Sequence, residues 1–189
     1  MPAFAETRLL GPGAQDLVER FFSIRGGEPT WLIVVALILS LWAASGAMMS
    51  LIAKTFDDAK AGKPIRLFKS HRDGFADGEQ RRDFIYVDDA VAVVRWMLET
   101  PSVTGIFNVG TGKARSFKDL IGAMYAALGR APNIEYVNMP AAIRDTYQYF
   151  TQSEVANLQR AGYNAGFAPL EESVRRYVTQ FLDREDRYR

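Results

Sequence analysis

The sequence contains no cysteine and a single histidine, His71. The lack of cysteine excludes disulfide bonds, thiolate catalysis and cysteine-ligated metal sites, and it fits a reducing compartment such as the cytosol. One imidazole is too few for a typical zinc site. Neither sign of charge dominates, because the sequence has 23 basic and 22 acidic residues. This balance argues against binding to nucleic acid or to an anionic membrane surface.

Two patterns of nicotinamide-dependent enzymes are also missing. Dinucleotide phosphates are held by a glycine-rich turn between a strand and a helix. Gly11-Pro12-Gly13 follows no convincing strand and contains a proline, and Gly110-Thr111-Gly112 has no third glycine at the required offset. No tyrosine is followed four positions later by a lysine. The chain therefore cannot place a phenol and an ammonium group one helical turn apart for general-base chemistry.

A long uncharged run is the most unusual feature that is present. Residues 29–53 carry no charge, and residues 31–42 are almost entirely apolar with a tryptophan at each end. A bilayer-spanning helix needs about 20 mostly apolar residues, and tryptophans are common at its interfaces. A buried core helix followed by a loop over residues 43–46 explains the run equally well. The sequence therefore allows two interpretations of this run, a membrane span and a buried core helix.

Beyond this run, strand-like and helix-like patterns alternate. At 189 residues, one domain is the simplest expectation and two small ones are possible. The alternation predicts an α/β architecture. The expected helices cover residues 48–60, 88–99, 117–128, 170–182 and a segment from 151 to a stop at Gly162. The expected strands cover residues 65–68, 84–87, 105–109 and 133–137, with a polar loop over 69–81.

A basic loop is the first candidate for chemistry. Lys69, Ser70, His71 and Arg72 follow the strand that ends at Phe68, and Arg82 lies close in sequence. Arginine suits bidentate contacts to phosphate, so the group could hold a diphosphate. The alternative is a solvated basic loop whose charge is balanced by its own acidic residues, Asp73, Asp77 and Glu79. Composition alone favours the solvated loop.

Other polar residues have a structural reading beside the functional one. Asp88 and Asp89 suit the start of a helix as caps, and we favour this over acid/base catalysis. His71 is a candidate proton donor or an incidental loop residue. Tyr147 offers a stacking face and a hydroxyl, yet its aromatic neighbours fit core packing as well. Asn108 could bind a ligand or shape the turn before Gly110.

Four passages carry a resemblance to a known family: 61–72, 76–89, 105–114 and 147–151. They include Arg82-Asp83-Phe84, Asn108-Val109-Gly110 and Tyr147-Gln148-Tyr149-Phe150-Thr151. Over residues about 48–182 the chain resembles the C-terminal part of ADP-glyceromanno-heptose 6-epimerases, in the extended short-chain dehydrogenase/reductase superfamily. The resemblance implies the α/β fold of the C-terminal substrate-binding part of an extended short-chain dehydrogenase/reductase. The uncharged run adds the expectation that a long apolar helix precedes this part.

The resemblance also implies function. The family uses NADP to epimerise ADP-heptose at C6″ for the lipopolysaccharide core, in the cytoplasm. Substrate-binding positions of the family match the loop residues Phe68, Lys69, Ser70 and His71, and also Arg82 and Tyr147. Lys54 departs from the family, since a substrate-contacting histidine can stand there. The family's catalytic lysine is missing from residues 44–47, so the resemblance implies substrate binding without catalysis and makes NADP binding by this chain doubtful.

Residues about 9–51 resemble, over a short stretch, BrkB-type membrane proteins. Together the two likenesses indicate a fusion, with residues 1–47 as an apolar helical segment and residues 48–189 as the nucleotide-sugar-binding part. The expected partner is ADP-heptose. A homo-oligomer and a membrane contact through residues 29–53 stay open, and no nucleic acid is expected. The alternative function is that of a membrane-anchored, catalytically inactive fusion or interaction protein.

Overall fold

A computed structural model describes residues 51–185 of the chain. The chain divides into two units, Met1–Met48 and Met49–Arg189, and every described residue lies in the second. The elements of this second unit, in chain order, are α3 (Leu51–Lys60), β1 (Ile65–Phe68), β2 (Arg81–Arg82), α4 (Val87–Glu99), β3 (Arg115–Ser116), α5 (Phe117–Ala127), β4 (Ile134–Val137), α6 (Ala141–Arg144), α7 (Ala156–Arg160), α8 (Leu170–Tyr177) and a π-helical turn at Val178–Leu182.

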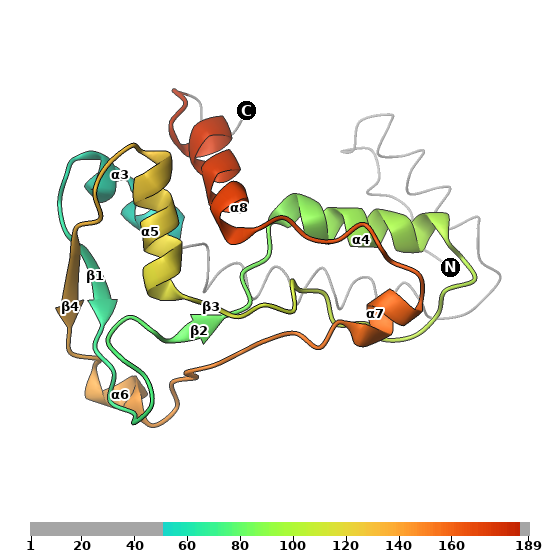
Figure 1. Ribbon diagram of the computed structural model, residues 1–189, viewed down its shortest axis with the longest axis horizontal. Helices are drawn as coiled ribbons and strands as arrows, with labels where there is room; N and C mark the ends of the chain where they lie inside the picture. Colours follow the sequence, from blue (N-terminus) through green and yellow to red (C-terminus); the bar gives the residue numbers. More distant parts are fainter. Residues whose placement is uncertain (1–50, 186–189) are drawn as a thin grey trace, which may run out of the picture. The chain divides into compact units, whose positions relative to one another are not determined.

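The main core lies between a small parallel sheet and three helices. β1 pairs in parallel with β4, from Ile65 opposite Ile134 to Phe68 opposite Val137. Helices α3, α5 and α8 gather beside these strands (Figure 1). Phe56, Ile121 and Met124 are fully buried in the same cluster. Alternate residues of β1 enter the core, as expected for a strand with one buried face.

A capping box sets the start of α5. The backbone N–H of Asp119 donates to the Ser116 hydroxyl at 3.0 Å, and the Asp119 carboxylate accepts from the Ser116 N–H at 3.2 Å. These bonds satisfy two backbone donors at the helix start. The helix stops before Gly129, whose φ of 66° lies in the left-handed region. The helix predicted over residues 117–128 is therefore confirmed, and these local interactions set its two ends.

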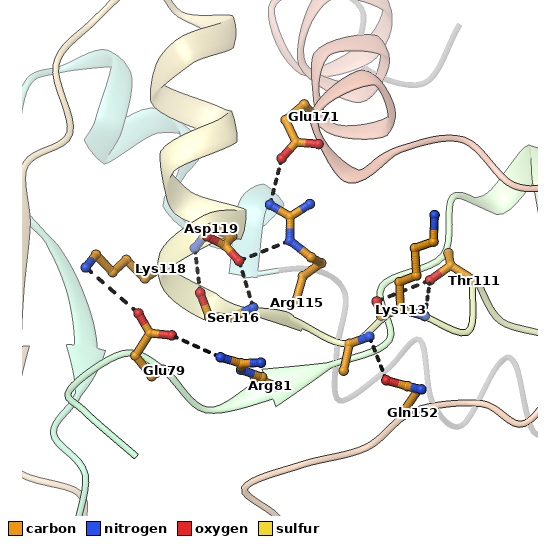
Figure 2. A network of polar contacts seen from close by, with 11 residues as sticks. Glu79, Arg81, Thr111, Lys113, Arg115, Ser116, Lys118, Asp119, Gln152 and Glu171 are labelled. Carbon is orange, nitrogen blue, oxygen red and sulfur yellow. Dashed lines mark hydrogen bonds and ion pairs between the residues drawn. The ribbon is translucent and has the colours of Figure 1, made fainter. Parts of the chain in front are cut away.

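A second sheet links three distant segments. Arg81 and Arg82 of β2 pair antiparallel with Ser116 and Arg115 of β3. On the other side, Arg81 forms a parallel bridge to Phe150. The segment around residue 150 is thereby laid beside β2. Figure 2 shows the polar side chains around this junction, where Arg115 bonds both Asp119 and Glu171.

A smaller cluster packs α4 against α7. Val93 and Leu158 are completely buried, and Tyr163 joins them. Phe107 and Val109 pack against this cluster from the segment that follows α4. Asp89 supports the arrangement by accepting a hydrogen bond from the N–H of Ala168 at 2.8 Å.

Two of the four expected strands are confirmed and two are wrong. Strands at 65–68 and 134–137 are present, whereas residues 84–86 and 105–109 are not in strands. Within residues 51–185, neither segment has a neighbouring strand with which to form a ladder. Their apolar side chains pack on the clusters instead, as Phe84 does on the main core and Phe107 on the smaller one. An apolar alternating pattern predicts burial on one face, and a ladder needs a partner as well.

The expected helices are present with two shifts. Helix α7 begins at Ala156, so the helix start expected at residue 151 is wrong. The N–H of Ser153 is instead bonded to the carboxylate of Asp83, at 3.0 Å. The last helix changes to a π-helical turn from Val178. Asp88 and Asp89 lie in the first turn of α4 but make no side-chain cap, since Tyr86 holds the cap position.

The predicted apolar helix lies almost entirely outside the described residues. Only residues 51–53 of the run 29–53 are described, and they form the first turn of α3. Among residues 51–185, no helix has the length and apolarity that crossing a bilayer requires.

Candidate functional site

Arg82 lies at the centre of an aromatic cluster. Its guanidinium carbon is 5.5 Å from the centroid of the Tyr147 ring and 5.8 Å from that of Phe117. Its Nη1 donates to the backbone carbonyl of Arg81 at 2.8 Å. Burial lowers the pKa of Arg82, although the guanidinium stays charged at any physiological pH. The site thus holds a half-buried cation against two ring faces.

Tyr147 connects Arg82 to the end of β1. Its ring meets Phe68 edge-to-face, with centroids 6.1 Å apart, and meets Tyr149 in the same way at 5.6 Å. Burial raises the pKa of Tyr147, and the nearby Arg82 charge partly opposes this. The phenol is therefore neutral at physiological pH and can donate one hydrogen bond.

The basic loop is fixed by its backbone. The N–H of Lys69 donates to the carbonyl of Val137 at 2.8 Å, and the N–H of His71 donates to the Tyr149 hydroxyl at 3.0 Å. Ser70 donates its N–H to Asp77 at 2.7 Å and its hydroxyl to the carbonyl of Arg72 at 2.9 Å. The side chains of Lys69 and His71 are exposed. They are thus available to a ligand beside the aromatic cluster.

The structure brings together some of the six expected site residues more closely than others. Phe68, Arg82 and Tyr147 form one continuous cluster, and His71 reaches it through Tyr149. Among the described residues, no hydrogen bond, ion pair or ring contact joins the side chain of Lys69 or Ser70 to Arg82 or Tyr147. Lys54 is an exposed residue of α3.

Sequence reasoning missed Asp83. Its Oδ1 accepts from the N–H and hydroxyl of Thr111, and its Oδ2 accepts from the N–H groups of Gly112 and Ser153, at 2.9 and 3.0 Å. Burial alone would raise the pKa of Asp83, but these donors outweigh it and the pKa is lowered. The signal available in the sequence was that Asp83 is an acidic residue between Arg81-Arg82 and the apolar run 84–87.

Asp83 also explains the glycine turn. Consecutive N–H groups that converge on one point form an anion-binding nest, as in phosphate-binding loops. Here the N–H groups of Thr111 and Gly112 hold the chain's own carboxylate. Gly110-Thr111-Gly112 therefore does not fit a dinucleotide phosphate. Asn108 likewise bonds within the chain, since its side-chain amide donates to the carbonyl of Glu154 at 3.3 Å and links two distant segments.

Residues 51–185 contain no cluster of histidine and acidic side chains that could hold a metal ion. Glu79 lies between two cations, with Arg81 and Lys118 each 3.9 Å away (Figure 2). Arg72 covers the rings of Phe75 and Tyr149, at 5.9 and 5.7 Å from their centroids. The chemistry that these residues offer is the binding of an anion and of a flat ring.

Solved structures define the fold. The chain is similar to a Thermus thermophilus UDP-glucose 4-epimerase solved in complex with NAD, with a TM-score of 0.53 and 24% identity over 66% of this chain and 37% of that one. It is also similar to a Helicobacter pylori ADP-L-glycero-D-manno-heptose-6-epimerase, with a TM-score of 0.53 and 23% identity over 69% of this chain and 37% of that one. The fold is the α/β fold of extended short-chain dehydrogenases/reductases.

Sequence comparison then gives the family. The sequence model of the NAD dependent epimerase/dehydratase family matches residues 28–110. An ADP-L-glycero-D-manno-heptose-6-epimerase of Nitratidesulfovibrio vulgaris is 45% identical over 141 residues, which is 75% of this chain and 44% of that protein. One from Fusobacterium nucleatum is 40% identical over 149 residues, 76% of this chain and 45% of that protein. Residues 28–110 therefore match the NAD dependent epimerase/dehydratase family, and the chain spans less than half the length of these relatives.

The expected likeness of residues 9–51 to BrkB-type membrane proteins receives no support from these comparisons. The family match begins at residue 28, just before the uncharged run 29–53 and ahead of the expected boundary near residue 48. The membrane-anchored alternative likewise gains no support.

Proposed function

We propose that this chain carries the substrate-binding elements of an ADP-L-glycero-D-manno-heptose 6-epimerase and binds ADP-heptose. The proposed binding part is residues 48–189; residues 1–47, which we propose as a separate apolar helical segment, lie outside the described residues. The relatives that are 40–45% identical bear the name of this enzyme. The observation that carries the proposal is the cluster of Arg82, Tyr147 and Phe68 beside the basic loop.

Each part of the cluster suits one part of an ADP-sugar. Arg82 is a half-buried cation with donors for a diphosphate, and its low exposure to water strengthens that attraction. Lys69 and His71 are exposed beside it and would add donors to the phosphate or sugar oxygens. The rings of Tyr147 and Phe68 give a flat apolar wall. Ser70 adds a hydroxyl to the same loop.

The proposal covers binding and leaves out the hydride transfer. In the family the transfer needs NADP, and the residues described here do not fit that cofactor, since Asp83 occupies the nest at Gly110-Thr111-Gly112. The 189 residues also contain no tyrosine with a lysine four positions later. An active enzyme would therefore require a cofactor-binding part that these residues do not provide.

Calorimetric titration of the purified chain with ADP-heptose tests the proposal. Arg82→Ala should weaken binding about tenfold or more, since a charged hydrogen bond to phosphate is worth about 1.5–3 kcal/mol. Arg81→Ala is the matched control, because Arg81 is exposed and faces Glu79 instead of Tyr147. Equal affinity of the Arg82→Ala variant and the unchanged chain would remove Arg82 from the site. No binding by the unchanged chain would sink the proposal.

A further inference from the structure

Asp83 joins three segments that the chain brings together from far apart. Its two oxygens accept hydrogen bonds from Thr111, Gly112 and Ser153. A half-buried carboxylate is costly unless its oxygens are satisfied, and four donors satisfy both of them here. The contacts to these three residues therefore fix the position of Asp83, which directly follows Arg82 in the chain.

The contact to Ser153 extends a row of backbone bonds. The N–H of Arg81 donates to the carbonyl of Tyr149 at 2.8 Å, and the N–H of Thr151 donates to the carbonyl of Arg81 at 3.2 Å. If the parallel ladder continued, the N–H of Ser153 would donate to the backbone carbonyl of residue 83. The side chain of Asp83 takes that bond instead, at 3.0 Å. It thereby fixes the register of the segment that carries Tyr147 and Tyr149.

Gly110 shows how closely these segments approach. A Cβ atom at this position would lie 2.8 Å from Oδ2 of Asp83, and still closer to the side chain of Ser153. No side chain fits between them. The turn at residues 110–112, the Ser153 segment and Asp83 thus form one packed junction, with Arg82 on its edge.

From this junction we propose that Asp83 is a positioning residue for the Arg82–Tyr147 pair. In extended backbone, neighbouring side chains point to opposite sides, so anchoring Asp83 on one side directs Arg82 to the other. There Arg82 meets Tyr147, whose own segment Asp83 registers through Ser153. Asp83 therefore acts on both partners of the pair without contacting the ligand. The effect that we infer on ligand binding rests on the proposed function, whereas the positioning of Arg82 and Tyr147 does not.

The first test needs no ligand. The chain is labelled with 3-fluorotyrosine, and Tyr147→Phe identifies the fluorine resonance of Tyr147. Arg82→Ala should move this resonance, because the cation lies over the ring. Asp83→Asn should move it in the same direction, since the amide presents a donor where two N–H groups need an acceptor. Asp89→Asn is the control, because Asp89 also accepts from a distant N–H but lies in α4. A Tyr147 resonance that Asp83→Asn leaves in place overturns the inference.

A milder variant guards against loss of the fold. Thr111→Val removes one hydroxyl donor to Asp83 and should move the Tyr147 resonance by a smaller amount in the same direction. Should Asp83→Asn unfold, this variant decides the question, and an unmoved resonance again contradicts the inference.

Binding gives the second test. Asp83→Asn should weaken ADP-heptose binding about tenfold, and it should add little further loss in the Arg82→Ala background, because both changes remove the same interaction. Additive losses would contradict the positioning role. A Tyr147 resonance that moves as expected in a chain that binds no ADP-heptose would support the role of Asp83 and refute the proposed function.

Discussion

At the scale of single residues, the neighbours Arg82 and Asp83 have different roles. Arg82 faces two aromatic rings and stays available to an anion. Asp83 faces the glycine turn and is fully occupied by backbone donors. A glycine turn of this kind suggests a phosphate site when it is met in a sequence. Here its role is to hold a carboxylate of the same chain, so an apparent ligand motif is part of the scaffold.

Gly110 provides a residue-scale prediction. Gly110→Ala should lower the free energy of unfolding by about 2 kcal/mol, because the new methyl group overlaps Asp83 and Ser153. Gly122→Ala is the control, since the position is inside α5 and a Cβ there would meet no atom within 4 Å apart from its chain neighbours and the backbone of its own helix. Alanine should stabilise that helix by about 0.5–1 kcal/mol. Urea unfolding of both variants measures the difference, and equal stabilities would contradict the crowding at Gly110.

At the scale of elements, α4 has a wider apolar arc than the described residues cover. Ala90 and Val93 are buried, whereas Val87, Val91 and Leu98 are 55%, 57% and 45% exposed. The exposed positions are spaced by four and seven residues and therefore lie on one face of the helix. Ile106, just beyond the helix, is 84% exposed. This part of the fold presents apolar surface to solvent.

The two faces of α4 give an element-scale prediction. Val91→Asn should change the free energy of unfolding by at most about 0.5 kcal/mol, since Val91 is exposed and both residues have similar helix propensity. Val93→Asn in the same helix should cost about 3 kcal/mol, because it buries an amide without a partner. Thermal unfolding of the pair checks this. A large loss for Val91→Asn would show that its side chain is buried against something.

At the scale of the whole molecule, the chain corresponds to less than half of a relative's length. The residues that it shares with those relatives form a core of their own around α5. Arg82 and Tyr147, the proposed substrate-binding residues, are held together within this unit. We therefore expect substrate binding and hydride transfer to be separable.

This separation gives a whole-molecule prediction. The purified chain should contain no NADP and should not convert ADP-heptose to its C6″ epimer, because it lacks the glycine fingerprint and the tyrosine–lysine pair. Mass spectrometry of the denatured protein measures bound cofactor, and chromatography of the sugar nucleotides measures turnover. Stoichiometric NADP, or any epimer above the background without protein, would contradict the prediction.

Local interactions made several features predictable from the sequence. Helix α5 follows from Ser116, Asp119 and Gly129, since a capping box and a left-handed stop act within a few residues. Strands β1 and β4 follow from short apolar runs with turn residues at their ends. Family motifs were enough to select Arg82 and Tyr147 as candidates, and this selection stays a prediction of their role.

Only the tertiary structure decided which segments have partners. Residues 84–87 and 105–109 have the pattern of strands, yet a ladder depends on a neighbour that sequence periodicity does not contain. For the same reason Asp83 was passed over, because its three partners lie 28 to 70 positions away along the chain. The amino-acid sequence by itself determined the local elements, and it shows that these 189 residues contain neither the glycine fingerprint nor the tyrosine–lysine pair. Contacts between distant segments determined which charged groups stay free for a ligand and which ones the fold uses.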